Sequence, residues 1–325
     1  MLTRRRVVAG LAGLFVTNAI GGESAQALTR KKNNTKVKPA NSAVASPELV
    51  RPSSLDPVVL SSPSKQVVFY APHPDDELLS FGVIASEYVA LGYEVIYVLL
   101  TSGSTSTAIK LINGELASPG NGTRFVYKGL HNPTTAGYTP LTIEEVGRAR
   151  VTEFKSSAGE MNISPDRVHT FDLLKAGDLT PEDVAPAMRE IVALYPKAIH
   201  WTMSTIDLHP HHRAAGEALR VIGQESGLLT AYTISRTTWE VLSGERAKAN
   251  TTIPSTFYFK PTADRMQRVR NAALTYNAWN PQAGSYAVGY TSVPKQFEDL
   301  DSKSDAQYAV MTPTLESVNA WMPTV

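Results

Sequence analysis

The amino-acid sequence predicts an α/β protein with a Rossmann-like, doubly wound and mostly parallel sheet, followed by an irregular C-terminal extension. Short apolar segments alternate along the chain with longer segments in which apolar residues have helical spacing, as in successive βαβ units. The short segments are apolar almost throughout, as expected of strands that helices cover on both faces. With 325 residues, the chain has room for one large α/β domain or two small ones.

The elements follow in order from residue 66. A first strand is expected at 66–71, where Pro72 ends it, and a helix at 78–91, which stops at Gly92. A second strand is expected at 94–100, before a long loop rich in Gly, Ser and Thr. The remaining predicted elements are a helix at 143–161, a strand at 168–173, a helix from Thr180 with Pro181 in its first position, a strand at 198–203 and a helix at 212–223.

The N-terminal part of the chain has the features of a targeting signal followed by a linker. Residues 1–27 combine an arginine-rich start, an apolar stretch and the small-residue pattern Ala25-Gln26-Ala27, which is typical of an export signal, here of the twin-arginine type. A buried helix or a membrane anchor is the alternative. Residues 28–64 lack sustained periodicity and are interpreted as a flexible linker. The folded α/β domain is then expected at 65–325, with its extension starting at about 230. We expect the protein to be secreted or held in the cell envelope.

Composition excludes several classes of function. The chain has 31 basic and 30 acidic residues, so no charge excess favours nucleic acid, and no membrane insertion is expected once the signal is cleaved. There are no cysteines, so any metal must be bound by histidine and carboxylate side chains. No Gly-x-Gly-x-x-Gly follows the first strand, which argues against a dinucleotide-binding enzyme.

An acidic cluster follows the first strand in the segment Pro72-His73-Pro74-Asp75-Asp76-Glu77. Three adjacent acids repel one another unless positive charge compensates them. A helix N-terminus offers partial compensation, so an acidic cap of the next helix explains the carboxylates. This interpretation gives no role to His73, which a metal site would explain.

A histidine cluster follows the fourth strand in the segment Asp207-Leu208-His209-Pro210-His211-His212. It contains three of the seven histidines of the chain. A polar loop that caps the next helix is the alternative. Both clusters lie just after strands, at the edge where doubly wound sheets carry their sites. Two imidazoles and one carboxylate form a zinc site with an open position for water.

The two clusters resemble the paired signatures of the PIG-L/LmbE-type N-acetylglucosamine deacetylases. His73-Pro74-Asp75-Asp76-Glu77 is similar to the first signature, and His209-Pro210-His211-His212 is similar to the second, His-Pro-Asp-His, except that His211 stands where the family usually has Asp. Arg150 and Glu153 resemble the family's Arg-x-x-Glu helix pattern, which is also an ordinary surface ion pair. The resemblance covers roughly residues 66–220.

The resemblance implies a zinc-dependent deacetylase acting on an N-acetylated sugar. It implies that His73, Asp76 and His212 bind Zn²⁺ and that Asp75 is the general base. A protonated His209 would stabilise the oxyanion, and Arg150 is a candidate for contacting the substrate. His211 would orient a ligand or contact the substrate.

Two other functions remain open at this stage. A non-catalytic, exported carbohydrate-binding protein would have no need for the free carboxylate of Asp75. A zinc amidase with a non-sugar substrate would use the same ligands. Aromatic residues of the C-terminal region either pack in a core or stack on sugar rings; they are Tyr276, Trp279, Tyr286 and Tyr290.

Overall fold

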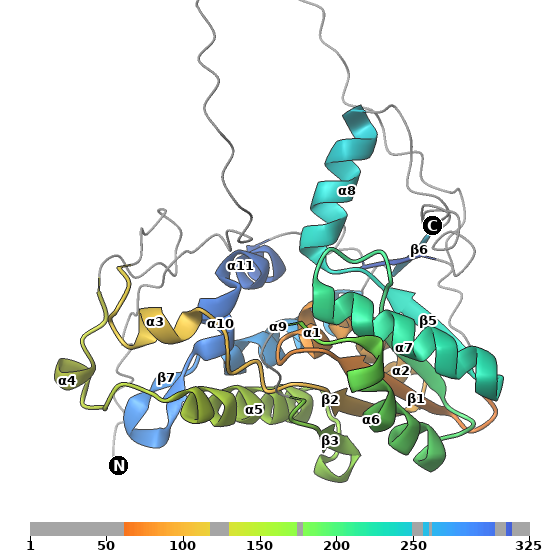
Figure 1. Cartoon of the computed structure of the whole chain (residues 1–325), viewed down its shortest axis with the longest axis horizontal. Helices are drawn as coiled ribbons and strands as arrows, with labels where there is room; N and C mark the ends of the chain where they lie inside the picture. Colours follow the sequence, from red (N-terminus) through yellow and green to blue (C-terminus); the bar gives the residue numbers. More distant parts are fainter. Residues whose placement is uncertain are drawn as a thin grey trace, which may run out of the picture. The chain divides into compact units, whose positions relative to one another are not determined.

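Five parallel strands form the central sheet in the order β3-β2-β1-β4-β5 (Figure 1). They are β1 (Gln66–Ala71), β2 (Glu94–Leu99), β3 (Val168–Thr170), β4 (Ile199–Met203) and β5 (Leu229–Thr233). The chain builds outward from β1 through β2 to β3, and then returns to place β4 on the other side of β1. The order therefore reverses between β1 and β4, and this is the switch point at which doubly wound sheets bind ligands.

The computed structural model describes residues 62–117, 130–173, 178–248, 256–259, 262–302 and 310–313. The export segment and almost all of the linker expected from the sequence lie outside these residues. Residues 62–64, which the sequence assigns to the linker, contact the folded domain: the Oγ atom of Ser64 donates a hydrogen bond of 2.9 Å to the carbonyl of Lys197.

Helices cover both faces of the sheet, as the apolar strands predict. Along β1, Val67 and Phe69 point to one face and Val68 and Tyr70 to the other, and all four are buried. The first face packs against α2 (Gly82–Ala90), α5 (Ile143–Glu160) and α9 (Ala263–Tyr276). The second packs against α6 (Pro181–Leu194) and α7 (Pro210–Ser226). The predicted fold class is thus confirmed.

Local signals define the starts of two helices. Thr180 caps α6 by accepting a hydrogen bond from the backbone N–H of Asp183, whose carboxylate accepts one in return from Thr180. Pro181 occupies the first position of α6, as the sequence predicts. Thr142 and Glu145 form the same reciprocal cap at the start of α5.

Shorter elements complete the described chain. They are α1 (Asp76–Leu79), α3 (Ala108–Ile112), α4 (Pro133–Ala136), η1 (Pro165–Arg167), α8 (Arg236–Lys248), β6 (Thr256–Phe259), β7 (Trp279–Asn280), η2 (Pro281–Ala283), β8 (Ser285–Tyr286), α10 (Val288–Ser292), α11 (Pro294–Ser302) and β9 (Val310–Pro313). Strands β6 and β9 pair antiparallel, as do β7 and β8.

The structure differs from the sequence prediction at several elements. Strand β3 ends at Thr170, three residues before the predicted end. The helix expected at 78–91 is divided into α1 and α2, with Ser80 and Phe81 between them. Helix α7 begins at Pro210, two residues before the predicted start, so that His212 lies in its first turn. The region beyond about 230, expected to be irregular, contributes most of β5 to the sheet and α9 to the core, where Met266 and Val269 are fully buried.

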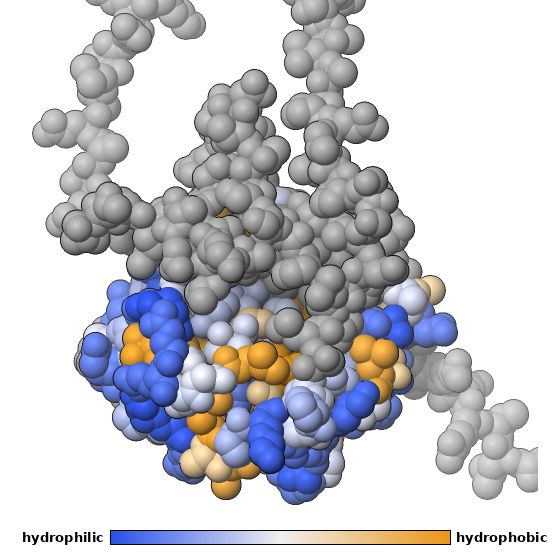
Figure 2. Space-filling view, turned by 90° about the vertical axis from the view of Figure 1, so that its right-hand side faces the viewer, coloured by the Kyte–Doolittle hydropathy of each residue, from blue (hydrophilic) through white to orange (hydrophobic). Residues whose placement is uncertain are grey.

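Exposed hydrophobic residues are spread over the described part of the surface. On the face shown in Figure 2, the described residues are largely hydrophilic, and hydrophobic residues lie in separate groups. The exposed large hydrophobic residues are spread over different elements, for example Leu91 after α2, Leu194 at the end of α6 and Leu274 in α9. Within the described ranges, no helix has the length and apolar character needed to cross a bilayer.

Candidate metal centre

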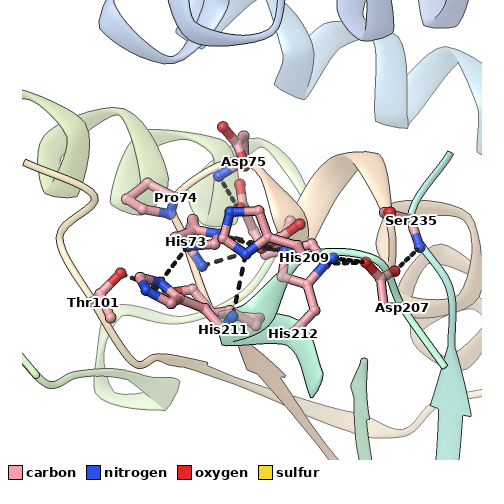
Figure 3. A network of polar contacts seen from close by, with 12 residues as sticks. His73, Pro74, Asp75, Thr101, Asp207, His209, His211, His212 and Ser235 are labelled. Atoms are coloured by element: carbon pink, nitrogen blue, oxygen red, sulfur yellow. Dashed lines mark hydrogen bonds and ion pairs between the residues drawn. The ribbon is translucent and has the colours of Figure 1, made fainter. Parts of the chain in front are cut away.

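The two sequence clusters meet at the switch point of the sheet. His73 lies two residues after β1, and Asp76 is the first residue of α1. His209 caps α7, and His211 and His212 lie in its first turn. Figure 3 shows the imidazole rings of the three α7 histidines gathered around His73.

Three side chains present ligand atoms in the spacing of a metal site. The Oδ2 atom of Asp76 lies 3.2 Å from Nδ1 of His73 and 3.2 Å from Nε2 of His212. These two nitrogens lie 3.3 Å apart. Ligands at about 2.0–2.1 Å from a tetrahedral zinc ion are themselves about 3.3 Å apart. The triangle therefore fits a small tetrahedral cation without movement of any ligand, and these three residues form a group that could hold a metal ion.

Asp207 fixes the orientation of His212. Its Oδ1 atom lies 3.1 Å from Nδ1 of His212, on the side of the ring away from the ligand triangle. The carboxylate is itself held by the backbone N–H of Ser235 at 2.7 Å and the hydroxyl of Thr238 at 2.9 Å. A carboxylate on the far nitrogen of a ligating histidine selects the tautomer and raises the basicity of the ligand.

Two carboxylates set the charge around His212. Burial lowers the pKa of His212, but Asp76 and Asp207 raise it by more. Burial raises the pKa of Asp76, but His212 and His73 lower it well below its usual range. Burial lowers the pKa of His73 to about 4. The ionised carboxylate of Asp76 thus lies between a neutral His73 and a positively charged His212, and a cation that binds here would displace the proton of His212.

Asp75 lies beside the ligand triangle and is held in a strained backbone conformation. Its φ angle is 121°, a value that non-glycine residues rarely adopt. Its backbone N–H donates to the carboxylate of Glu77 at 2.9 Å. Its own Oδ2 accepts a hydrogen bond of 2.7 Å from the guanidinium of Arg150. Burial raises the pKa of Asp75, and Arg150 opposes the rise.

Arg150 lies in the site and contacts Asp75. Its side chain is 5% exposed, and its two terminal nitrogens donate to Asp75 and to the carbonyls of Pro74 and Gly103. The structure directs the guanidinium to Asp75, and the contact with a substrate that the sequence predicts stays a prediction. The Arg-x-x-Glu pattern drew attention to Arg150. Its partner Asp75 could be identified only from the structure, in which α5 lies beside the loop after β1.

His209 is held as a neutral imidazole by its neighbours. Its Nδ1 accepts a hydrogen bond of 3.2 Å from the backbone N–H of His211, so the ring proton of the neutral form lies on Nε2. Desolvation among the clustered rings, with repulsion from His73 and His212, lowers the pKa of His209. A neutral His209 would donate through Nε2, and the protonated form expected from the sequence stays a prediction.

Several residues of the site could not be assigned from the sequence. Tyr276 was a candidate for stacking on sugar, but its ring is fully buried and its hydroxyl donates to Glu77 at 2.6 Å. Glu153 accepts hydrogen bonds from the backbone N–H groups of Val288 and Gly289 at 2.7 and 2.8 Å. These partners lie more than a hundred residues apart in the sequence, so only the Arg-x-x-Glu pattern could have drawn attention to Glu153.

Comparisons with known proteins agree with this geometry. The family model described as PIG-L, GlcNAc-PI de-N-acetylase, matches residues 68–222. A deacetylase of the teicoplanin biosynthetic pathway has a similar structure, with a TM-score of 0.52 at 14% identity, covering 76% of this chain and 96% of that chain. The deacetylase of the antimicrobial A40926 pseudoaglycone gives a TM-score of 0.50 at 15% identity, covering 77% and 96%.

A zinc-inhibited form of teicoplanin deacetylase has a TM-score of 0.52 at 14% identity, covering 76% of this chain and 96% of that chain. At such identities the structural likeness shows a shared fold. No curated protein matches the chain by sequence.

Proposed function

Residues 68–222 form a domain of the PIG-L de-N-acetylase family, and from this premise we propose that the protein is a zinc-dependent hydrolase that removes the acetyl group from an N-acetylated sugar. One observation carries the proposal. The ligand triangle of His73, Asp76 and His212 lies beside a separate carboxylate, Asp75, which contacts a buried arginine. A carbohydrate-binding protein would need no more than the three metal ligands, whereas hydrolysis also needs a proton acceptor next to them.

Zinc held by His73, Asp76 and His212 would supply a water of lowered pKa and polarise the acetamide carbonyl. Side chains of the protein carry out the proton transfers and stabilise the oxyanion. Burial raises the pKa of Asp75, which suits a group that accepts a proton at neutral pH and returns it to the departing amine. The ion pair with Arg150 fixes the direction of the carboxylate and keeps enough of it ionised.

His209 is the proposed donor to the oxyanion. Its Nδ1 accepts the backbone N–H of His211, so that Nε2 carries a proton even when the imidazole is neutral. A neutral donor stabilises negative charge that develops on the acetyl oxygen without needing a change of protonation. This proposal replaces the protonated His209 expected from the sequence.

The substrate and the location of the protein are also proposals. An N-acetylated amine of a sugar is favoured by the family description, GlcNAc-PI de-N-acetylase. The arginine-rich start and the Ala25-Gln26-Ala27 segment support export to the envelope or beyond, where an acetylated glycan, glycoside or glycolipid would be met.

The test combines metal content with acetate release, using the purified full chain. We expect about one zinc per chain in the wild type and in Asp75→Asn, and a loss of zinc in His212→Ala. Asp75→Asn and His212→Ala should each abolish acetate release from N-acetylated sugars. The control is Asp166→Asn, which replaces an exposed carboxylate of η1 and should leave acetate release unchanged. Release from acetylated peptides alone would support an amidase with another substrate. A zinc-loaded wild type that binds sugars without turnover would support the carbohydrate-binding alternative.

A further inference from the structure

His73 makes contacts through both of its ring nitrogens. Its Nδ1 atom faces the ligand triangle, 3.2 Å from Asp76 and 3.3 Å from His212. Its Nε2 atom lies 2.9 Å from Nδ1 of His211. A ligating imidazole gives one nitrogen to the metal, and its other nitrogen needs a hydrogen-bond partner. In this chain that partner is His211.

The direction of this hydrogen bond follows from the place of the ring protons. When Nδ1 of His73 offers its lone pair to a cation, the proton of the ring lies on Nε2, which donates to His211. His211 then accepts at Nδ1 and carries its own proton on Nε2. That nitrogen lies 4.0 Å from the carboxylate of Asp178, the only charged group found within ion-pair distance of it in the described chain.

We propose that His211 is a positioning residue that holds His73 in the tautomer and ring orientation required to bind the metal. This proposal rests on the metal site of the proposed function and adds a role for the residue at which the chain departs from the His-Pro-Asp-His pattern. A neutral imidazole accepts a single hydrogen bond at Nδ1, and the geometry aims this lone pair at His73. His211 therefore acts on metal affinity and has no need to touch the substrate.

The experiment measures the zinc affinity of the full chain by competition with a chelating indicator. His211→Ala removes the acceptor, and we expect zinc to bind roughly 10–100-fold more weakly. His211→Asn places an amide oxygen near the position of Nδ1, and should restore most of that affinity. The matched control is His169→Ala, which removes a half-buried imidazole on β3 that contacts Tyr195, and its affinity should equal that of the wild type.

A second measurement identifies what has changed. The visible spectrum of the Co²⁺-substituted protein should keep its tetrahedral bands in His211→Ala, because all three ligands remain. Equal zinc affinity in the wild type and His211→Ala would overturn the positioning role while leaving the metal site intact. A wild type that binds no zinc would overturn the proposed function and this proposal together. Ligand atoms of His73, His209 and His211 also lie within 4.8 Å of one another, and a change from two zinc ions to one in His211→Ala would assign His211 as a ligand there and overturn the positioning role.

Discussion

Replacement of Arg150 by methionine tests the support of the proposed base. The substitution keeps the length and apolar stem of the side chain but removes the cation that lies 2.7 Å from Asp75. The side chains of the pair are 5% and 10% exposed, so solvent screens the interaction little. Breaking a buried pair by removing one partner typically costs about 3–5 kcal/mol, because the other charge stays buried. We expect Arg150→Met to lose about this much stability against urea.

The effect on catalysis follows from the same contact. Burial and the repulsion from Asp76 and Glu77 raise the pKa of Asp75, and without Arg150 only His212 opposes them. A smaller fraction of Asp75 is then ionised and its carboxylate is no longer held in place, so we expect kcat to fall on the order of 10²–10⁴-fold, with zinc content unchanged. The control is Arg148→Met, on the same helix, where a 72% exposed arginine lies 4.0 Å from Glu145. It should change stability by less than about 0.5 kcal/mol. A wild-type rate in Arg150→Met would refute the role of this ion pair.

Three further outcomes are expected. Burial raises the pKa of Glu153 from its usual 4.5 to about 7, so the stability that its proton provides is full below pH 4.5 and is lost as the pH rises through 7, by about 3 kcal/mol. In urea titrations, the free energy of unfolding of Glu153→Gln should therefore rise by this amount relative to that of the wild type between pH 4.5 and 8. A difference that stays constant with pH would exclude the raised pKa of Glu153. Asp207→Asn should weaken zinc binding about 10–100-fold in chelator competition, because His212 loses its orienting carboxylate; unchanged affinity would contradict that role. In Gly216→Ala the new methyl group would lie 2.6 Å from a carbonyl oxygen of β4, whereas in Gly159→Ala it would meet nothing within 4 Å. Gly216→Ala should destabilise the protein by about 1–3 kcal/mol, and Gly159→Ala should stabilise it by about 0.5–1 kcal/mol. Equal effects of the two substitutions in urea unfolding would refute the close approach of Gly216 to β4.

The sequence predicted the parts of the fold that depend on local pattern. The strand at 66–71 and the start of α6 at Pro181 agree with the structure residue by residue, because an apolar run ended by proline and a reciprocal helix cap are both local signals. The meeting of the two clusters was also predictable, since each follows a strand of a parallel sheet. Their chemical roles remain predictions.

Long-range partners could not be predicted from the pattern. Tyr276 lies 199 residues from Glu77, and no periodicity connects the two. Nor does any local pattern predict the positive φ of Asp75, whose carboxylate contacts Arg150, 75 residues away in the sequence. Arg150 itself carries the same sequence signal as a surface arginine, and only its burial in the structure distinguishes it.

The C-terminal region supports the site from outside the family match. The hydroxyl of Tyr276 donates to Glu77, whose other carboxylate oxygen accepts the backbone N–H of Asp75. Glu153 receives two backbone N–H groups from the start of α10, next to the ring of Tyr276. The first pair of contacts links α9 to the strained residue proposed as the base, and the second links α10 to α5, the helix that carries Arg150. Residues 68–222 contain every proposed ligand, yet the conformation of Asp75 depends on side chains that follow them, because a φ of 121° persists only where the surrounding structure enforces it.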